Sequence, residues 1–488
     1  MKKRGVFFTL CGIAFLCMIY AGYQYFYNTP NNTITYTSSG FRPTITQVEV
    51  GATVTFVNKN IRPMWPASDI HPSHELYPEF DARGGIMPGE SWSFVASEEG
   101  LWKYHDHLSS QFVGTLIVGD DSISPCDNSD SQECWMNRIE TMIEEEGVAA
   151  AFDEMVHIHR EYPDFASSCH NFAHDIGLKA YIYHGFDIEL TPKTSYCNAG
   201  FWHGYLEGVI SEADDKIVAQ AFCEEVDEAL RDGFPLAGPQ CVHGIGHGLL
   251  ENYITTRLDL WAQPNELINL SVADCEAMMD GYDETMRCVS GIFNVFRDFI
   301  VLNDDYRDYI NADNLFEICG TFSERYSKES CYWELAKVVG GSEFIEPLLE
   351  TGEGTFPVTN IVAEDIETYL PFTTRSWSIT MGRRMVKTNT PEEVVRACRV
   401  APPDVQIDCI QGLAEGAFFS AEPTKEVATI LPLCTYDGLT LAETERCYWQ
   451  LQQDIFYTYD KETIANMCSE IPTEVHTEQG CGTIVRDA

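Results

Sequence analysis

One short motif places two histidines where both side chains face the same way. In residues 103–118, KYHDHLSSQFVGTLIV, one residue separates His105 from His107. On a β-strand this spacing puts both imidazoles on one face and Asp106 on the other. Imidazole nitrogen is a good ligand for Cu(II) and for zinc. We therefore predict that His105 and His107 belong to a metal site.

A second group of histidines is spaced as on one face of an α-helix. The segments CHNFAHDIG, from Cys169, and CVHGIGHG, from Cys241, each hold two histidines four residues apart. Helices that point histidine and glutamate inward commonly build metal sites. We predict one pocket for zinc or another divalent metal, formed by His170, His174, His203, His243, His247, Glu207 and Glu251. Buried His–Glu hydrogen bonds between packed helices would give the same spacing, so that alternative stays open.

The helical part of the chain repeats a cysteine-centred motif. Segments from Cys197 and Cys241 share C-x2-G-x2-H-G-x-L-E, and those from Cys288 and Cys409 keep C-x2-G. Most intervals between such cysteines are about 34 to 47 residues. This period is typical of helix-hairpin units that stack on a shared core, in an open solenoid or a closed toroid.

The cysteines indicate an oxidising compartment. Of 18 cysteines, two lie in an N-terminal apolar segment, and the other 16 include no CxxC motif, which excludes zinc ribbons and thioredoxin-like redox motifs. Their even number suits a disulfide-rich extracytoplasmic protein. The predicted pairs are Cys223/Cys241, Cys275/Cys288, Cys319/Cys331, Cys398/Cys409, Cys434/Cys447 and Cys468/Cys481. The partners of Cys126, Cys134, Cys169 and Cys197 stay open.

Charge and hydropathy limit the partners. The chain has 31 basic and 75 acidic residues, a net charge of −44, which excludes nucleic acid and favours a cationic or metal-donor partner. An uncharged run from Val6 to Phe26 follows the basic KKRG and is long enough to cross a bilayer. We predict an uncleaved signal anchor, a single-pass transmembrane helix that leaves the bulk of the chain on the extracytoplasmic side of the cell membrane.

Composition divides the chain into four parts. Residues 1–28 form the anchor, and residues 29–120 alternate apolar and polar residues between turn signals, as in an antiparallel β-sandwich. Residues 121–134 are a polar, acidic linker, and residues 135–488 have the apolar period of α-helices. The predicted fold class is multidomain: a transmembrane helix, a β-sandwich, and an all-α, disulfide-stapled repeat domain.

Residues 33–119 resemble the cupredoxin family. The resemblance rests on ITQVEVGATVTFVNKN, HPSH, MPGESWSF and GLWKYHDHLSSQFVGTLIVGD. It implies a copper site at one end of the sandwich, with His71 and His74 of DIHPSH brought to the same end as His105 and His107. In a relative that has lost its metal, these histidines would instead only hydrogen-bond with nearby carboxylates, namely Asp69, Glu75 or Asp106.

The copper-binding cysteine of that family is missing. Aligning FVG with the family's Met-x-Gly puts Phe112 at the methionine position and Tyr104 at the cysteine position. Aligning HDHL with the His-Cys-His strand of multicopper oxidases puts Asp106 at the cysteine position. Blue copper sites need the thiolate. We therefore expect a nitrogen-rich, tetragonal Cu(II) site without intense blue colour.

Three functions fit these patterns. The first is a membrane-anchored metal-binding protein that captures copper in the sandwich and passes it to the helical domain. The second is an extracytoplasmic metalloenzyme with its active site in the helical His/Glu cluster. The third is a metal-free structural or partner-binding protein. The metal content of each half distinguishes them.

Overall fold

The computed structural model of the protein describes residues 32–71, 73–119, 131–162, 165, 168–213, 216–260, 263–302, 314–340, 348–349, 354–358, 361, 364–387 and 389–482. The predicted anchor and most of the predicted linker lie outside these residues. Among the helices within them, none is both long and apolar enough to cross a membrane.

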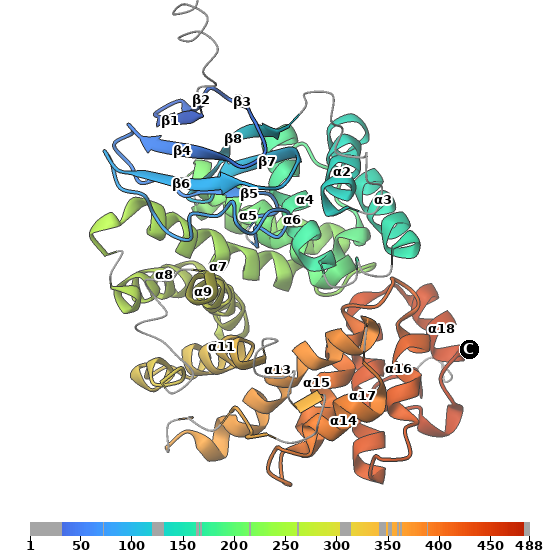
Figure 1. The fold of residues 1–488 in the computed structure, drawn as a ribbon. Helices are drawn as coiled ribbons and strands as arrows, with labels where there is room; N and C mark the ends of the chain where they lie inside the picture. The colour runs from blue at the N-terminus through green and yellow to red at the C-terminus, as the bar shows by residue number, and fades with distance from the viewer. Residues whose placement is uncertain are drawn as a thin grey trace, which may run out of the picture.

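The N-terminal part of the described chain folds into two four-stranded sheets, which lie above the helices in Figure 1. The strands are β1 (Thr33–Thr37), β2 (Gly40–Arg42), β3 (Ile45–Val48), β4 (Ala52–Asn58), β5 (Pro66–Ser68), β6 (Ser91–Ala96), β7 (Gly100–Asp106) and β8 (Ser109–Val118). One sheet has the order β2-β1-β4-β6 and the other β3-β8-β7-β5. Pairing is antiparallel except for β1 with β4 and β3 with β8.

Aromatic side chains fill the space between the two sheets. Tyr104 is fully buried, and its ring centroid lies 5.0 Å from that of Phe41 and 5.4 Å from that of Phe56. Phe112 packs edge-on against Tyr36 at 5.8 Å. Tyr104 therefore belongs to the apolar core of the sandwich, and Phe112 packs against that core from a partly buried position.

Helices make up the rest of the described chain. The α-helices are α2 (Gln132–Glu146), α3 (Val148–Glu161), α4 (Cys169–His184), α5 (Gly200–Ala213), α6 (Lys216–Leu230), α7 (Ala237–Thr256), α8 (Pro264–Met278), α9 (Tyr282–Leu302), α11 (Arg325–Ala336), α13 (Ile366–Lys387), α14 (Pro391–Cys398), α15 (Gln406–Phe418), α16 (Glu426–Cys434), α17 (Leu441–Thr458) and α18 (Lys461–Ser469). Short 3-10 turns are η2 (Pro192–Ala199), η3 (Leu258–Leu260), η4 (Ile318–Thr321), η5 (Val338–Gly340) and η6 (Thr473–Val475).

The repeat helices pack in sequence and curve until the two ends of the domain meet. Each helix of the series α4, α5, α7, α9, α11, α13, α15 and α17 packs on the next. In Figure 1 the C-terminal helices return to the side of α3. There Arg160 of α3 forms an ion pair at 2.5 Å with Glu422, which precedes α16. This contact favours the closed toroid over the open solenoid.

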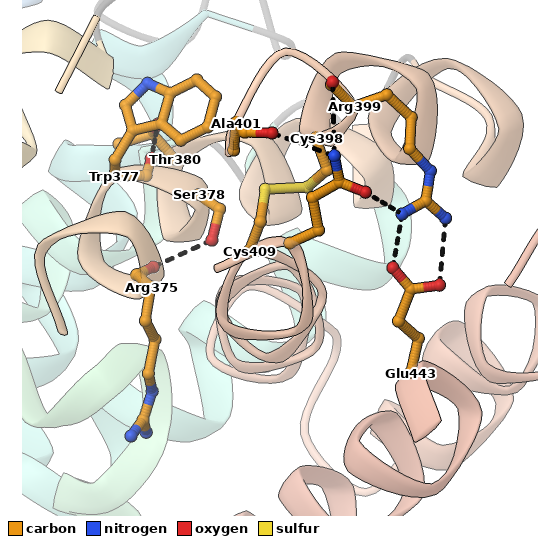
Figure 2. The surroundings of a disulfide bond; sticks show 10 residues. Arg375, Trp377, Ser378, Thr380, Cys398, Arg399, Ala401, Cys409 and Glu443 are labelled. Atoms are coloured by element: carbon orange, nitrogen blue, oxygen red, sulfur yellow. Dashed lines mark hydrogen bonds and ion pairs between the residues drawn. A yellow bond between two sulfur atoms is a disulfide. The ribbon is translucent and has the colours of Figure 1, made fainter. Parts of the chain in front are cut away.

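Disulfides staple the repeats as the spacing predicts. All six predicted pairs are present, and a seventh joins Cys169 at the start of α4 to Cys197. Cys134 is also disulfide-bonded. Figure 2 shows one staple, Cys398–Cys409, which ties α14 to α15, with Arg375 pointing away from it. Seven disulfides in the described residues are typical of an extracellular or secreted domain.

Removal of one staple tests this assignment. We expect the double substitution Cys398→Ser with Cys409→Ser to lower the free energy of unfolding by about 2–4 kcal/mol, because the bond no longer restricts the unfolded chain. Urea denaturation measures the loss. Metal content should not change, since neither cysteine contacts a histidine of the candidate site. Peptide mapping without reductant that finds either cysteine paired across repeats would contradict the assignment.

The sandwich and the helical domain share a core. Trp65, Ala67, Ile70 and Leu108 of the sandwich belong to the same buried apolar cluster as the helices. Polar contacts frame this interface: Lys103 of β7 pairs with Glu140 of α2, and Asn171 of α4 donates a hydrogen bond to Glu75. An apolar interface with partly buried polar contacts holds the histidine end of the sandwich in a fixed place against α4 and α5.

Candidate metal centre

The four histidines predicted in the sandwich lie together at its helix-facing end. His71 and His74 lie in the loop after β5. His105 lies near the end of β7, which pairs with β5, and His107 follows β7 directly. Each is at most 5% exposed. One ring nitrogen from each lies within 4.8 Å of the other three. The indole of Trp65 covers His107, with ring centroids 4.3 Å apart.

Carboxylates orient two of these imidazoles. Asp69 Oδ1 lies 3.0 Å from His105 Nδ1, and Asp81 Oδ2 lies 2.9 Å from His74 Nδ1. Each carboxylate accepts the Nδ1 proton and so turns the Nε2 lone pair toward the centre of the cluster. Carboxylates commonly fix the ring and tautomer of a metal-binding histidine in this way.

Two lone pairs then face each other across a short gap. His71 Nε2 lies 3.3 Å from Glu207 Oε2, so a proton on Nε2 leaves His71 Nδ1 as a lone pair. That atom lies 3.1 Å from His105 Nε2, and His107 Nδ1 lies 3.1 Å from His74 Nε2. A bound cation would relieve the repulsion between such lone pairs. With bonds of about 2.0–2.1 Å, neighbouring nitrogen ligands stand roughly 2.9–3.4 Å apart, so the donor set fits a metal ion.

The helical histidines also converge. His203 lies at their centre, with its ring centroid 4.4 Å from His247, 4.8 Å from His243, 5.2 Å from His170 and 5.8 Å from His174. Ligand atoms of His174, His203 and His247 lie within 4.8 Å of one another, whereas His170 and His243 stand beside this set. Both ring nitrogens of His203 are buried and have no hydrogen-bond partner in the described chain.

Close helix packing brings these residues together. The repeat glycines let backbones touch: a Cβ on Gly204 would stand 2.0 Å from the carbonyl oxygen of His174, and one on Gly244 would stand 2.3 Å from that of Trp202. The α4, α5 and α7 backbones therefore approach closely, which brings the histidines of three different helices within reach of one another.

Glu207 joins the two clusters into one centre. Its carboxylate lies 3.3 Å from His71 of the sandwich, 3.2 Å from His174 and 2.9 Å from His247. Glu251 completes a third group, because ligand atoms of His71, Glu207 and Glu251 also lie within 4.8 Å of one another. The sequence predicts two separate sites, whereas the folded chain places them side by side across the domain interface.

Burial sets the charge states of this centre. Burial lowers the pKa of His105 to about 4 and that of His203 well below its usual value. Burial alone would raise the pKa of Glu207, but the contacts with His174, His247 and His71 lower it. Burial, aided by the charge of Glu207, raises the pKa of Glu251 to about 8. His105 and His203 are therefore neutral imidazoles and Glu207 is an ionised carboxylate, the forms that bind metal. His71 differs, because Glu207 raises its pKa against the effect of burial, so a metal ion would have to displace a proton there.

A buried cation stands behind the ligands. Lys179 of α4 lies 3.6 Å from Asp69, 3.8 Å from Asp175 and 3.5 Å from Glu140. Burial would lower the pKa of Lys179, but these three carboxylates raise it well above its ordinary value. Lys179 thus links the carboxylate that orients His105 to two helices. No sequence pattern indicates Lys179 or Asp81. Asp69 is expected from the sequence as a possible hydrogen-bond partner of the histidines, because it lies two residues before His71.

Comparison with known proteins finds similarity to solved structures alone. No family model matches the chain, and no curated protein matches it. Among solved structures, a novel purple cupredoxin from Nitrosopumilus maritimus is similar: it is 23% identical, with a TM-score of 0.16, and the match covers 18% of this chain and 98% of that one. At that score the likeness carries no argument about the site, so the assignments here depend on side-chain geometry.

Proposed function

We propose that the protein is a membrane-anchored, extracytoplasmic metal-binding protein with a centre shared by its two domains. In this proposal His71, His74, His105 and His107 hold copper, and His174, His203 and His247 hold a second ion, zinc or another divalent metal. Residues 1–28 would tether the protein to the membrane, and a cationic protein would donate the metal to its acidic surface.

One observation carries the proposal. The 3.1 Å separation of His71 Nδ1 and His105 Nε2, each with its other nitrogen next to a carboxylate, needs a cation between them. A proton on His71 can supply that charge, since Glu207 raises the pKa of His71 against the effect of burial, and a metal ion can supply it as well. Four nitrogen donors suit Cu(II) or zinc, and the cupredoxin resemblance favours copper.

Copper loading tests the proposal. We expect the full-length protein to bind one Cu(II) in the sandwich, with a large parallel hyperfine splitting in electron paramagnetic resonance and no intense thiolate-to-copper band. His105→Ala should abolish this signal, because it removes both a ligand and the partner of Asp69. Metal analysis after dialysis gives the stoichiometry.

A matched histidine provides the control. His157 of α3 is largely exposed and lies 3.6 Å from Glu161, away from the metal centre, so His157→Ala should leave the spectrum and the stoichiometry unchanged. Copper bound equally by His105→Ala and the parent would refute the sandwich site. A parent that retains no metal would leave the structural, partner-binding function as the better description.

A metalloenzyme is the second candidate, and the burial of the centre is consistent with it. The ligand groups of both clusters are enclosed at the domain interface, where a reaction would be shielded from water. Glu251, with a pKa raised to about 8 by burial, would keep a proton at neutral pH next to the centre. Such a group can act as a general acid beside a bound metal.

A further inference from the structure

His71 presents its two ring nitrogens to two different groups of ligands. Its Nδ1 atom lies 3.1 Å from His105 Nε2, within the histidine cluster of the sandwich. Its Nε2 atom lies 3.3 Å from Glu207 Oε2, and ligand atoms of His71, Glu207 and Glu251 lie within 4.8 Å of one another. The imidazole of His71 therefore stands between the sandwich cluster and two carboxylates of the helical domain.

The two carboxylates come from the same position of neighbouring repeats. Glu207 of α5 stands ten residues after Cys197, and Glu251 of α7 stands ten residues after Cys241. Helices α5 and α7 pack directly on each other, so equivalent positions of the two repeats meet. The repeat thus supplies two carboxylates at the domain interface, and the sandwich supplies the imidazole of His71.

Within the described residues, no lysine or arginine pairs with either carboxylate. The ion pairs of Glu207 are all with histidines, namely His71, His174 and His247. Its Oε2 atom is buried and accepts no hydrogen bond from the described chain. Glu251 is half-buried and forms no ion pair or hydrogen bond there. Because buried carboxylates are normally paired with a cation or bound to a metal, this pair lacks a positive charge that the chain does not supply.

We propose that His71 Nε2, Glu207 and Glu251 bind a divalent metal ion such as zinc, so that the imidazole of His71 bridges this ion and the copper of the sandwich. The 3.3 Å between His71 Nε2 and Glu207 Oε2 suits two ligands of one metal whose bonds are about 2.0–2.2 Å long. As the metal–nitrogen bond forms, the Nε2–H bond of His71 breaks and its proton passes to the solvent.

The ligand set also indicates what kind of site this is. Three protein ligands leave a fourth position of a tetrahedral metal open, which is typical of catalytic rather than structural zinc sites. The inference rests on the proposed copper site, next to which it places a further ion, and it makes Glu251 a ligand rather than an acid.

Electron paramagnetic resonance of the full-length protein tests the bridge, since an imidazolate couples the spins of two Cu(II) ions antiferromagnetically. His203→Ala is the suitable background, because it removes the helical histidine set and His203 contacts neither carboxylate. With one equivalent of Cu(II), this variant should give the signal of an isolated copper. With two bound equivalents, most of the spin intensity should be lost relative to the total copper found by metal analysis. Zinc in place of the second copper should restore the signal of one copper.

Substitution of Glu251 separates the bridge from the copper site. In the same background, Glu251→Gln should abolish the loss of spin intensity and weaken zinc binding by at least about 10-fold. Its signal with one copper and its thermal unfolding midpoint should match those of His203→Ala alone, because Glu251 is not a ligand of the sandwich. Glu228→Gln, which replaces an exposed carboxylate of α6, should change none of these quantities.

The possible outcomes distinguish this inference from the proposed function. If His203→Ala binds only one metal ion, or shows full spin intensity with two bound copper ions, the bridge is wrong and the four-histidine copper site stands. Equal zinc affinity with and without Glu251→Gln would also overturn the bridge. A protein that binds no copper at all would overturn the proposed function and the bridge together.

Discussion

Substitution of Glu207 by glutamine is expected to weaken metal binding in both halves of the centre, by about 10- to 100-fold each. Glu207 contacts His71 of the sandwich and His174 and His247 of the helices. A neutral amide keeps the volume but removes the charge that holds His71 Nε2 protonated, and so it frees His71 to adopt the wrong tautomer. Competition with a chelator of known affinity measures each loss.

The comparison of single and double substitutions shows whether the centre is one unit. Glu207→Gln combined with His71→Ala should cost the sandwich site less than the sum of the single effects, because the two residues act through one contact. Glu224→Gln replaces an exposed carboxylate of α6 and should have no effect on either metal. If Glu207→Gln weakens only the metal held by the helices, the two sites are independent and the shared centre is wrong.

The sequence predicts the local parts of this centre better than their assembly. His105 and His107 share a strand face because of their two-residue spacing, and the i,i+4 pairs share a helix face, so both local groups follow from backbone geometry. The contact between His71 and Glu207 depends on how two domains dock. No local period encodes that docking.

The same limit applies to charge. A net charge of −44 gives no indication of the buried Lys179, because composition averages over the surface and the interior. The disulfide pairs, in contrast, follow from short loops, and the structure adds Cys169–Cys197, whose larger separation left it unassigned.

Replacement of Gly246 by alanine should disrupt both the fold and the centre. A Cβ at this position would stand 1.9 Å from the carbonyl oxygen of Cys288, where α7 and α9 cross. On the other side of the same crossing, a Cβ on Gly291 would stand 2.0 Å from the carbonyl oxygen of His243. Neither backbone atom can rotate away, so the helices must separate by about 1 Å or more in a close-packed core.

We expect a net loss of at least about 3 kcal/mol in the free energy of unfolding. This loss remains after alanine has contributed its helix preference over glycine, roughly 1 kcal/mol. Because His247 follows Gly246 directly, any variant that still folds should also bind the helical metal less tightly. Gly208→Ala in α5 is the matched control for stability: the three atoms nearest to its Cβ all belong to the side chain of Tyr181, the closest at 2.7 Å, and a side chain can move. Urea denaturation of both variants, with metal analysis of Gly246→Ala, decides the matter. Equal stabilities would show that the α7–α9 crossing is looser than the backbone contact implies, and that these glycines do not set the position of the histidines.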